Sequence, residues 1–167
     1  MKQLLYSIAI TTLLLTGAAG NLLAQKTKVT AKQAPTAMIT DSSNWEFTAT
    51  QAMPQYGTPQ YISANYTVTC TGKKLVVYLP YYGRATAGID VYSGKGPLDF
   101  KSTDFTIKRL KAKAGRWSIS IRPNDYREVQ SMDFTFYDDG TANLNVNLSN
   151  RSPISFTGTV AAVTNQQ

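Results

Sequence analysis

The densest group of side chains suited to binding chemistry lies in residues 79–85, which have the sequence LPYYGRA. Pro80 has no backbone N–H and should end the strand before it, so a short connection carries Tyr81, Tyr82 and Arg84. Tyrosine rings stack on planar or sugar-like ligands, and arginine forms paired hydrogen bonds with anionic groups. Binding groups commonly lie on loops held by a rigid sheet, so Tyr81, Tyr82 and Arg84 are the candidate ligand-binding residues.

The same segment also has a purely structural explanation. Either of the two tyrosines can cap an open end of the β-structure, and Gly83 can supply a turn. Arg84 can form an ion pair with Asp90. Both explanations stay open at the level of the sequence.

A second candidate site is electrostatic. The chain has 17 Lys and Arg against 10 Asp and Glu, a formal net charge of +7. A basic patch is expected near the tip of one predicted hairpin, formed by Lys108, Arg109, Lys111, Lys113 and Arg116. Such a patch attracts lipopolysaccharide, acidic polysaccharide or an anionic membrane surface, although a solvated hairpin tip explains it too. Nucleic acid is not expected as a partner, because no nucleic-acid-binding module is recognisable.

Histidine and cysteine usage excludes several kinds of catalysis. The chain has no histidine, which excludes Ser-His-Asp and Cys-His mechanisms and His-ligated zinc or iron. Cys70 is the one cysteine, so no intramolecular disulfide can form, and its strand position predicts a small buried hydrophobe. Six carboxylates occur singly and cannot be paired from the sequence: Asp90, Asp99, Asp104, Asp125, Glu128 and Asp133. We therefore expect no enzymatic activity, no metal and no cofactor.

The elements that must position these residues are β-strands. Apolar residues alternate with polar ones at 45–49, 64–70, 75–79, 89–91, 105–107, 117–121, 132–136, 142–148 and 154–160. A period of two with one apolar face indicates half-buried antiparallel strands, and the connections are too short for βαβ crossovers. The predicted fold is therefore all-β, an antiparallel sandwich or flattened barrel of about eight or nine strands.

The register of two hairpins follows from matching their apolar faces. A three-residue loop at 138–140 pairs Phe136 with Ala142, Phe134 with Leu144 and Met132 with Val146. Gly140 would then take the left-handed position of a type I turn with a G1 bulge. The next hairpin is predicted to pair Leu148 with Ile154 and Val146 with Phe156.

The N-terminal residues predict export. A positive start at Lys2 is followed by an apolar run at 4–15 and by a small-residue cluster, the pattern of a secretory signal. The run is shorter than the roughly 20 residues that span a bilayer, so the mature chain should have no transmembrane segment. We expect a signal peptide at 1–24, a flexible leader at 25–44, one β domain at 45–163 and a tail at 164–167. The expected location is the periplasm or the exterior.

Four segments also carry a family resemblance. They are LPYYGRA at 79–85, Trp117 before an alternating strand, DGTA at 139–142 and NRSPISFTG at 150–158. Together they resemble the domain-of-unknown-function family 4251, exported proteins of Bacteroidota, over about residues 45–160. The resemblance implies a small β-rich envelope or secreted domain and carries no established activity.

Two function classes remain in competition. In the first, the chain is a binding module for a small or acidic, glycan-like ligand at residues 79–85. In the second, it is a structural or protein-interaction component of the cell envelope. A concave, partly apolar pocket beside residues 79–85 would favour the first class, and a filled interior with a flat exposed apolar patch would favour the second.

Overall fold

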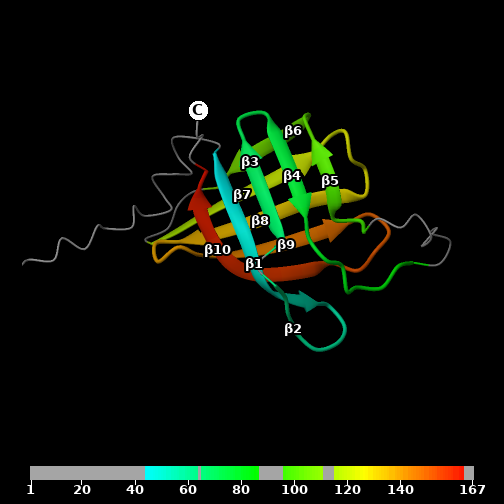
Figure 1. Ribbon diagram of the computed structural model, residues 1–167. Helices are drawn as coiled ribbons and strands as arrows, with labels where there is room; N and C mark the ends of the chain where they lie inside the picture. Colours follow the sequence, from blue (N-terminus) through cyan, green and yellow to red (C-terminus); the bar gives the residue numbers. More distant parts are fainter. Residues whose placement is uncertain (1–43, 64, 87–95, 111–114, 164–167) are drawn as a thin grey trace, which may run out of the picture. The chain divides into compact units, whose positions relative to one another are not determined.

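The computed structural model describes residues 44–63, 65–86, 96–110 and 115–163, and these form an antiparallel β-sheet without a helix (Figure 1). The strands are β1 (Trp45–Pro54), β2 (Gln60–Tyr61), β3 (Thr67–Thr71), β4 (Lys74–Tyr78), β5 (Asp99–Ser102), β6 (Phe105–Arg109), β7 (Arg116–Pro123), β8 (Val129–Tyr137), β9 (Thr141–Leu148) and β10 (Ile154–Ala162). This confirms the predicted all-β antiparallel fold, but β2 and β5 were not among the expected strands. The signal peptide and nearly all of the leader, the strand expected at 89–91, and the tail lie outside the described residues.

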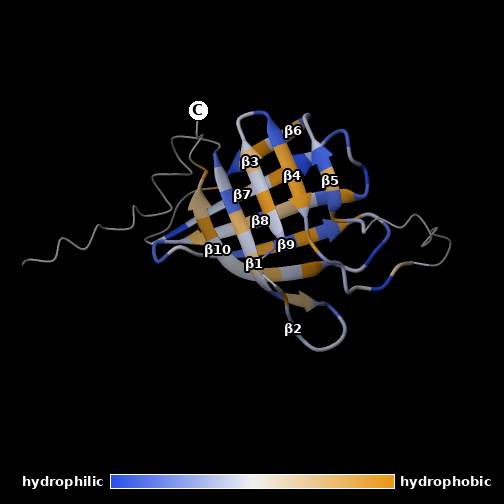
Figure 2. Ribbon diagram, in the orientation of Figure 1, coloured by the Kyte–Doolittle hydropathy of each residue, from blue (hydrophilic) through white to orange (hydrophobic). Residues whose placement is uncertain are grey.

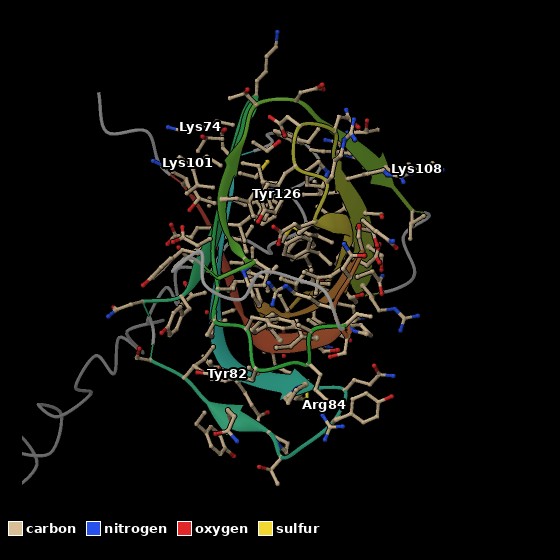
Figure 3. The ribbon with its side chains drawn as sticks, turned by 90° about the vertical axis from the view of Figure 1, so that its right-hand side faces the viewer. Lys74, Tyr82, Arg84, Lys101, Lys108 and Tyr126 are labelled. Carbon is tan, nitrogen blue, oxygen red and sulfur yellow. The ribbon has the colours of Figure 1, made fainter. Side chains whose placement is uncertain are left out.

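The sheet curves into a nearly closed barrel, as its strand order shows. The order is β5-β4-β3-β1-β10-β9-β8-β7-β6, with β2 pairing on β1. The two edge strands, β5 and β6, follow each other in the chain and are separated only by Thr103 and Asp104. Two residues cannot cross the width of a flat sheet, so the edges must meet through twist and curvature. Strands on opposite sides of the barrel consequently face each other in Figure 3.

Apolar side chains fill the space that the curved sheet encloses. Hydrophobic and hydrophilic residues alternate along the strands in Figure 2, and the inward set is buried. Trp45 meets Phe134 and Phe136 edge to face, with ring centroids 5.0 and 5.4 Å apart. Within the described residues, every buried side-chain nitrogen or oxygen has a hydrogen-bond partner. The interior is therefore a packed core.

The β8–β9 hairpin has the predicted register. Phe136 pairs with Ala142, Phe134 with Leu144 and Met132 with Val146. Gly140 has a φ of 85°, and its N–H donates to the Tyr137 carbonyl oxygen at 3.0 Å. Asp139 accepts a hydrogen bond from the Thr141 N–H at 2.8 Å, which closes the turn. The left-handed glycine expected at this turn is confirmed.

The predicted register of the β9–β10 hairpin is wrong by two residues. Val146 pairs with Ile154 and Leu144 with Phe156, so the apolar faces still match but the loop is longer. The cause is a distant segment, because the loop backbone hydrogen-bonds to residues 84–86 instead of closing on itself. The Ser152 N–H donates to the Arg84 carbonyl oxygen at 2.9 Å, and the Thr86 N–H donates to that of Asn150 at 3.0 Å.

One carboxylate fastens the corner where β5 turns into β6. Asp125 accepts hydrogen bonds from the Ser102 hydroxyl at 2.5 Å and from the backbone N–H groups of Thr103 at 2.9 Å and Asp104 at 3.2 Å. The hydrogen bond from Ser102, followed by those of the backbone, lowers the pKa of Asp125 below 3.8. A side chain from the β7–β8 connection thus fixes the end of β5 and the two-residue turn that leads into β6.

The neighbouring Tyr126 seals the same end of the barrel. Its ring stacks on Phe100 with centroids 4.1 Å apart, and its hydroxyl donates to the Pro97 carbonyl oxygen at 3.1 Å. Burial is the main cause that raises the pKa of Tyr126 to about 12, so this hydroxyl remains a hydrogen-bond donor at neutral pH. Figure 3 shows Tyr126 between the two sides of the curved sheet.

The Asp125 corner predicts a pH-dependent contribution to stability. The folded pKa is lowered, so the carboxylate stabilises the fold fully above its ordinary value of 3.8 and loses this effect as pH falls through the folded value. Asp125→Asn should therefore lower the urea midpoint at neutral pH, and the gap to the unmodified protein should close on acidification. A gap that stays constant from neutral pH to about pH 2.5 would contradict this role.

Candidate functional site

Residues 79–85 leave the sheet at the end of β4. Leu79 is buried, and its N–H donates to the Leu98 carbonyl oxygen at 2.9 Å. Pro80 follows immediately and cannot donate to a ladder, so the chain departs from the sheet here as predicted. The segment then runs alongside the β9–β10 loop, with an isolated bridge between Ala85 and Arg151.

Tyr81 fastens this segment to the β9–β10 loop. Its hydroxyl donates to the Ser152 carbonyl oxygen at 2.7 Å and lies 3.2 Å from the Ser152 hydroxyl. The Ser152 hydroxyl in turn accepts from the Arg84 N–H at 2.9 Å. A Cβ at Gly83 would collide with the Tyr81 hydroxyl and lie 2.7 Å from the Ser152 hydroxyl, so only glycine fits here. The structural explanation therefore applies to Tyr81 and Gly83.

Tyr82 and Arg84 project from the same segment into solvent. Tyr82 is 45% exposed, and both side chains lie on the surface beside the β1–β2 connection in Figure 3. The Arg84 guanidinium lies over the ring of Tyr56, 5.2 Å from its centroid. Tyr56 is itself 56% exposed. The three side chains, called here the tyrosine–arginine surface, present two aromatic rings and one oriented cation.

Tyr56 was not among the predicted site residues, and the partner predicted for Arg84 was Asp90. Tyr56 precedes Gly57, which has a φ of 116°, in a turn between β1 and β2. The Tyr-Gly pair indicates a turn at this position. No local pattern, however, indicates that the turn would contact Arg84. The proposed partner Asp90 lies outside the described residues.

The predicted basic patch is described only in part. Lys108 and Arg109 are exposed at the end of β6, and Arg116 is exposed at the start of β7. Lys111 and Lys113 lie outside the described residues. Lys108 faces the outside of the sheet together with Arg122, which the sequence analysis did not single out.

Cys70 is a buried core residue, as its strand position predicted. Its side chain is fully buried on β3, and burial raises the pKa of its thiol to about 11 despite the nearby charge of Arg109. The thiol is therefore protonated at neutral pH and unreactive.

Three hollows that described residues line lie away from residues 79–85. The first, of about 530 Å³, lies on the outer face of β6, β7 and β8, and the second, of about 340 Å³, extends from it toward Ser149. The third, of about 290 Å³, lies between the β3–β4 turn and β6, with Phe105 and Ile107 in its lining. None of these three hollows is the pocket beside residues 79–85 that would favour a ligand-binding module, so binding at the tyrosine–arginine surface would use exposed side chains.

The described part of the chain has neither a cluster of metal-binding side chains nor a membrane-spanning helix. There, no three side chains of His, Cys, Asp and Glu come close enough to hold a metal ion. The same residues include no helix with the length and apolar character needed to cross a bilayer.

Comparison with known proteins identifies the family. The family model described as Domain of unknown function (DUF4251) matches residues 27–160. A crystal structure of a DUF4251 family protein from Bacteroides eggerthii DSM 20697 matches with a TM-score of 0.56 and 17% identity, covering 80% of this chain and 88% of that one. This similarity shows a shared fold, whereas no curated protein matches the chain significantly. Because the family model spans most of the sequence, the chain belongs to the DUF4251 family of domains of unknown function.

Proposed function

We propose that this chain is an exported binding domain whose tyrosine–arginine surface takes a small, glycan-like ligand that carries an anionic group. The observation that carries the proposal is the contrast between neighbouring residues in one segment. Tyr81 is fixed to Ser152 by its hydroxyl, whereas Tyr82 and Arg84 stay exposed on the backbone that this contact holds. Groups presented on a fixed backbone lose little freedom on binding.

The chemistry of the three side chains suits a sugar with a carboxylate or similar group. The exposed rings of Tyr56 and Tyr82 offer flat apolar faces for the C–H groups of a sugar, and their hydroxyls can hydrogen-bond to its polar edge. The Arg84 guanidinium can pair with an anion through two parallel hydrogen bonds. Its position over Tyr56 restricts its orientation before any ligand arrives.

Export and the absence of catalysis belong to the same proposal. The signal pattern at 1–24 supports a periplasmic or secreted protein, and the family match begins at residue 27, just beyond the predicted cleavage region. The lack of histidine in the sequence leaves binding as the simpler activity.

A second candidate function is protein interaction within the envelope, supported by two observations. Among the described residues, the inward side chains form one buried hydrophobic cluster, whereas some small β-barrels hold a ligand in a central cavity. In addition, Tyr61 on the short β2 is 88% exposed and lies in the same β1–β2 region as Tyr56. Exposed tyrosines are common in protein interfaces.

Binding to a panel of short neutral and acidic oligosaccharides tests the first function. For any glycan bound, Tyr82→Ala and Arg84→Ala should each weaken binding by about 1–3 kcal/mol, with little change between low and physiological salt. The matched control is Tyr78→Ala, because Tyr78 is 47% exposed, close to the 45% of Tyr82, but lies on β4 stacked on Tyr66. Tyr78→Ala should leave binding unchanged.

A charge-only explanation predicts a different pattern. Lys111→Ala/Lys113→Ala removes two cations of the predicted basic patch and should produce a small loss that disappears as salt rises. If this variant caused the larger loss, and Tyr82→Ala none, the assignment to the tyrosine–arginine surface would be wrong. Isothermal titration at two ionic strengths separates the two cases.

A further inference from the structure

The outer face of β6, β7 and β8 carries a polar groove whose lining shares no residue with the tyrosine–arginine surface. It consists of the two adjoining hollows of about 530 and 340 Å³, which share Arg122, Asn124 and Gln130 in their linings. Lys108 lies at one end of this groove, and Arg127 and Ser149 at the other. Hollows of this size are within the range that ligands of drug size occupy.

The sheet register aligns the groove residues. Thr106 pairs with Arg122 and Lys108 with Ser120, so these four side chains share the outer face of the two strands. On β8 the register shifts between Val129 and Ser131, which leaves Gln130 without a partner on β9. Bulges of this kind redirect a side chain, and here Gln130 lines both hollows.

The loop that supplies Arg127 is fixed as well. The Ser149 hydroxyl donates to the Arg127 carbonyl oxygen at 2.7 Å, and the Ser149 N–H donates to that of Glu128 at 3.0 Å. The groove is thus built on two paired strands and a tethered turn, which favours a specific site over a flexible charged tip.

The groove carries a net positive charge, and its side chains include both hydrogen-bond donors and hydrogen-bond acceptors. Within the described part of the chain, none of the three cations Lys108, Arg122 and Arg127 forms an ion pair with a carboxylate. The nearby Asp133 is already engaged, because it accepts from the Ser120 hydroxyl at 2.5 Å and from the Ser131 hydroxyl at 3.0 Å. These hydroxyls therefore present lone pairs to the groove, while the cations present donors.

We propose that this groove binds a linear acidic polysaccharide, with carboxylate-bearing sugar units along Lys108, Arg122 and Arg127. An acidic sugar has anionic groups for the cations and hydroxyl groups for the Ser, Thr, Asn and Gln side chains. A membrane surface fits less well, because the lining has no exposed aromatic or aliphatic side chain to insert into lipid. Single-stranded nucleic acid fits less well because the groove has no aromatic ring on which a base could stack.

The test uses the full mature chain and an oligogalacturonide probe, with a neutral maltooligosaccharide of similar length as the control ligand. Arg122→Gln and Lys108→Gln should each weaken oligogalacturonide binding about tenfold or more at physiological salt. The matched control is Lys101→Gln, which removes the same charge from an exposed position on β5, on the opposite side of the barrel from Lys108 in Figure 3. This control should change affinity less than about twofold.

Several outcomes would overturn the proposal. Equal losses from Lys101→Gln and Lys108→Gln would show diffuse attraction by net charge rather than a site. The same variant pattern with anionic phosphatidylglycerol vesicles or single-stranded DNA, at equal or higher affinity, would replace the polysaccharide by that partner. A failure of the oligogalacturonide to bind at low salt would also contradict the proposed polysaccharide site. The losses from Arg122→Gln and Lys108→Gln should persist in a Tyr82→Ala/Arg84→Ala background, which lacks the tyrosine–arginine surface, so the two sites can fail separately.

Discussion

Phe134→Ala is expected to destabilise the domain by about 3–5 kcal/mol, the cost of removing a large ring from a packed core. Phe134 is 1% exposed and lies at the centre of three ring contacts. Its centroid is 5.0 Å from that of Trp45, 5.8 Å from that of Phe47 and 5.6 Å from that of Phe136. The strands on both sides of β8 limit how far the backbone can collapse into the space left behind.

Urea unfolding followed by tryptophan fluorescence measures this loss. The matched control is Phe105→Ala, because Phe105 is a half-buried phenylalanine on the edge strand β6. Its removal should produce a clearly smaller loss, since solvent already reaches the ring. Equal losses at the two positions would mean that the barrel interior is not packed around Phe134.

Gly158→Ala is expected to destabilise the domain by about 1–3 kcal/mol or more, although it adds a single methyl group. Gly158 pairs with Ala49 on one side and Ala142 on the other, at the point where the register of β1 shifts between Ala49 and Gln51. An added Cβ would collide with the Thr48 carbonyl oxygen and lie 3.0 Å from the Ala49 Cα. These are backbone atoms of a paired strand, so they cannot move without disturbing the ladder.

Gly96→Ala provides the comparison for this substitution. A Cβ at Gly96 would meet nothing within 4 Å, so alanine should be tolerated and could slightly stabilise the fold by restricting the unfolded chain. Thermal unfolding of the two variants distinguishes a steric effect at Gly158 from a general effect of replacing glycine. A neutral Gly158→Ala would mean that the close approach of β1 and β10 is wrong.

Local patterns were sufficient to predict the strands and one hairpin. The alternation of apolar residues predicted the antiparallel sheet, and the Asp-Asp-Gly loop predicted the pairing of Phe136 with Ala142. The β9–β10 register failed because its loop hydrogen-bonds to residues 84–86, a contact between segments far apart in the sequence. The corner at Asp125 could not be predicted for the same reason, because its partner Ser102 is 23 positions away in the sequence.

The candidate site was predicted to the level of the segment but not of the side chain. The sequence alone does not distinguish Tyr81 from Tyr82. The hydrogen bond from the Tyr81 hydroxyl to Ser152, 71 positions away, shows that Tyr81 connects two segments of the fold. Arg122 was overlooked although it occupies a polar position of an alternating strand. The groove around Arg122 depends on the bulge beside Gln130 and on the tethered Arg127, and no local sequence pattern predicts either feature.

The most direct test of the proposed function is mass spectrometry of the small molecules that co-purify with the protein from its native envelope. Three forms are compared: the unmodified protein, the double variant Tyr82→Ala/Arg84→Ala, and the matched control Tyr78→Ala. We expect at least one small glycan-like species with an acidic group to accompany the unmodified protein and the control but not the double variant, whereas a polysaccharide bound in the groove would accompany all three. The same molecules with all three forms, or none with any form, would contradict a binding function at the tyrosine–arginine surface.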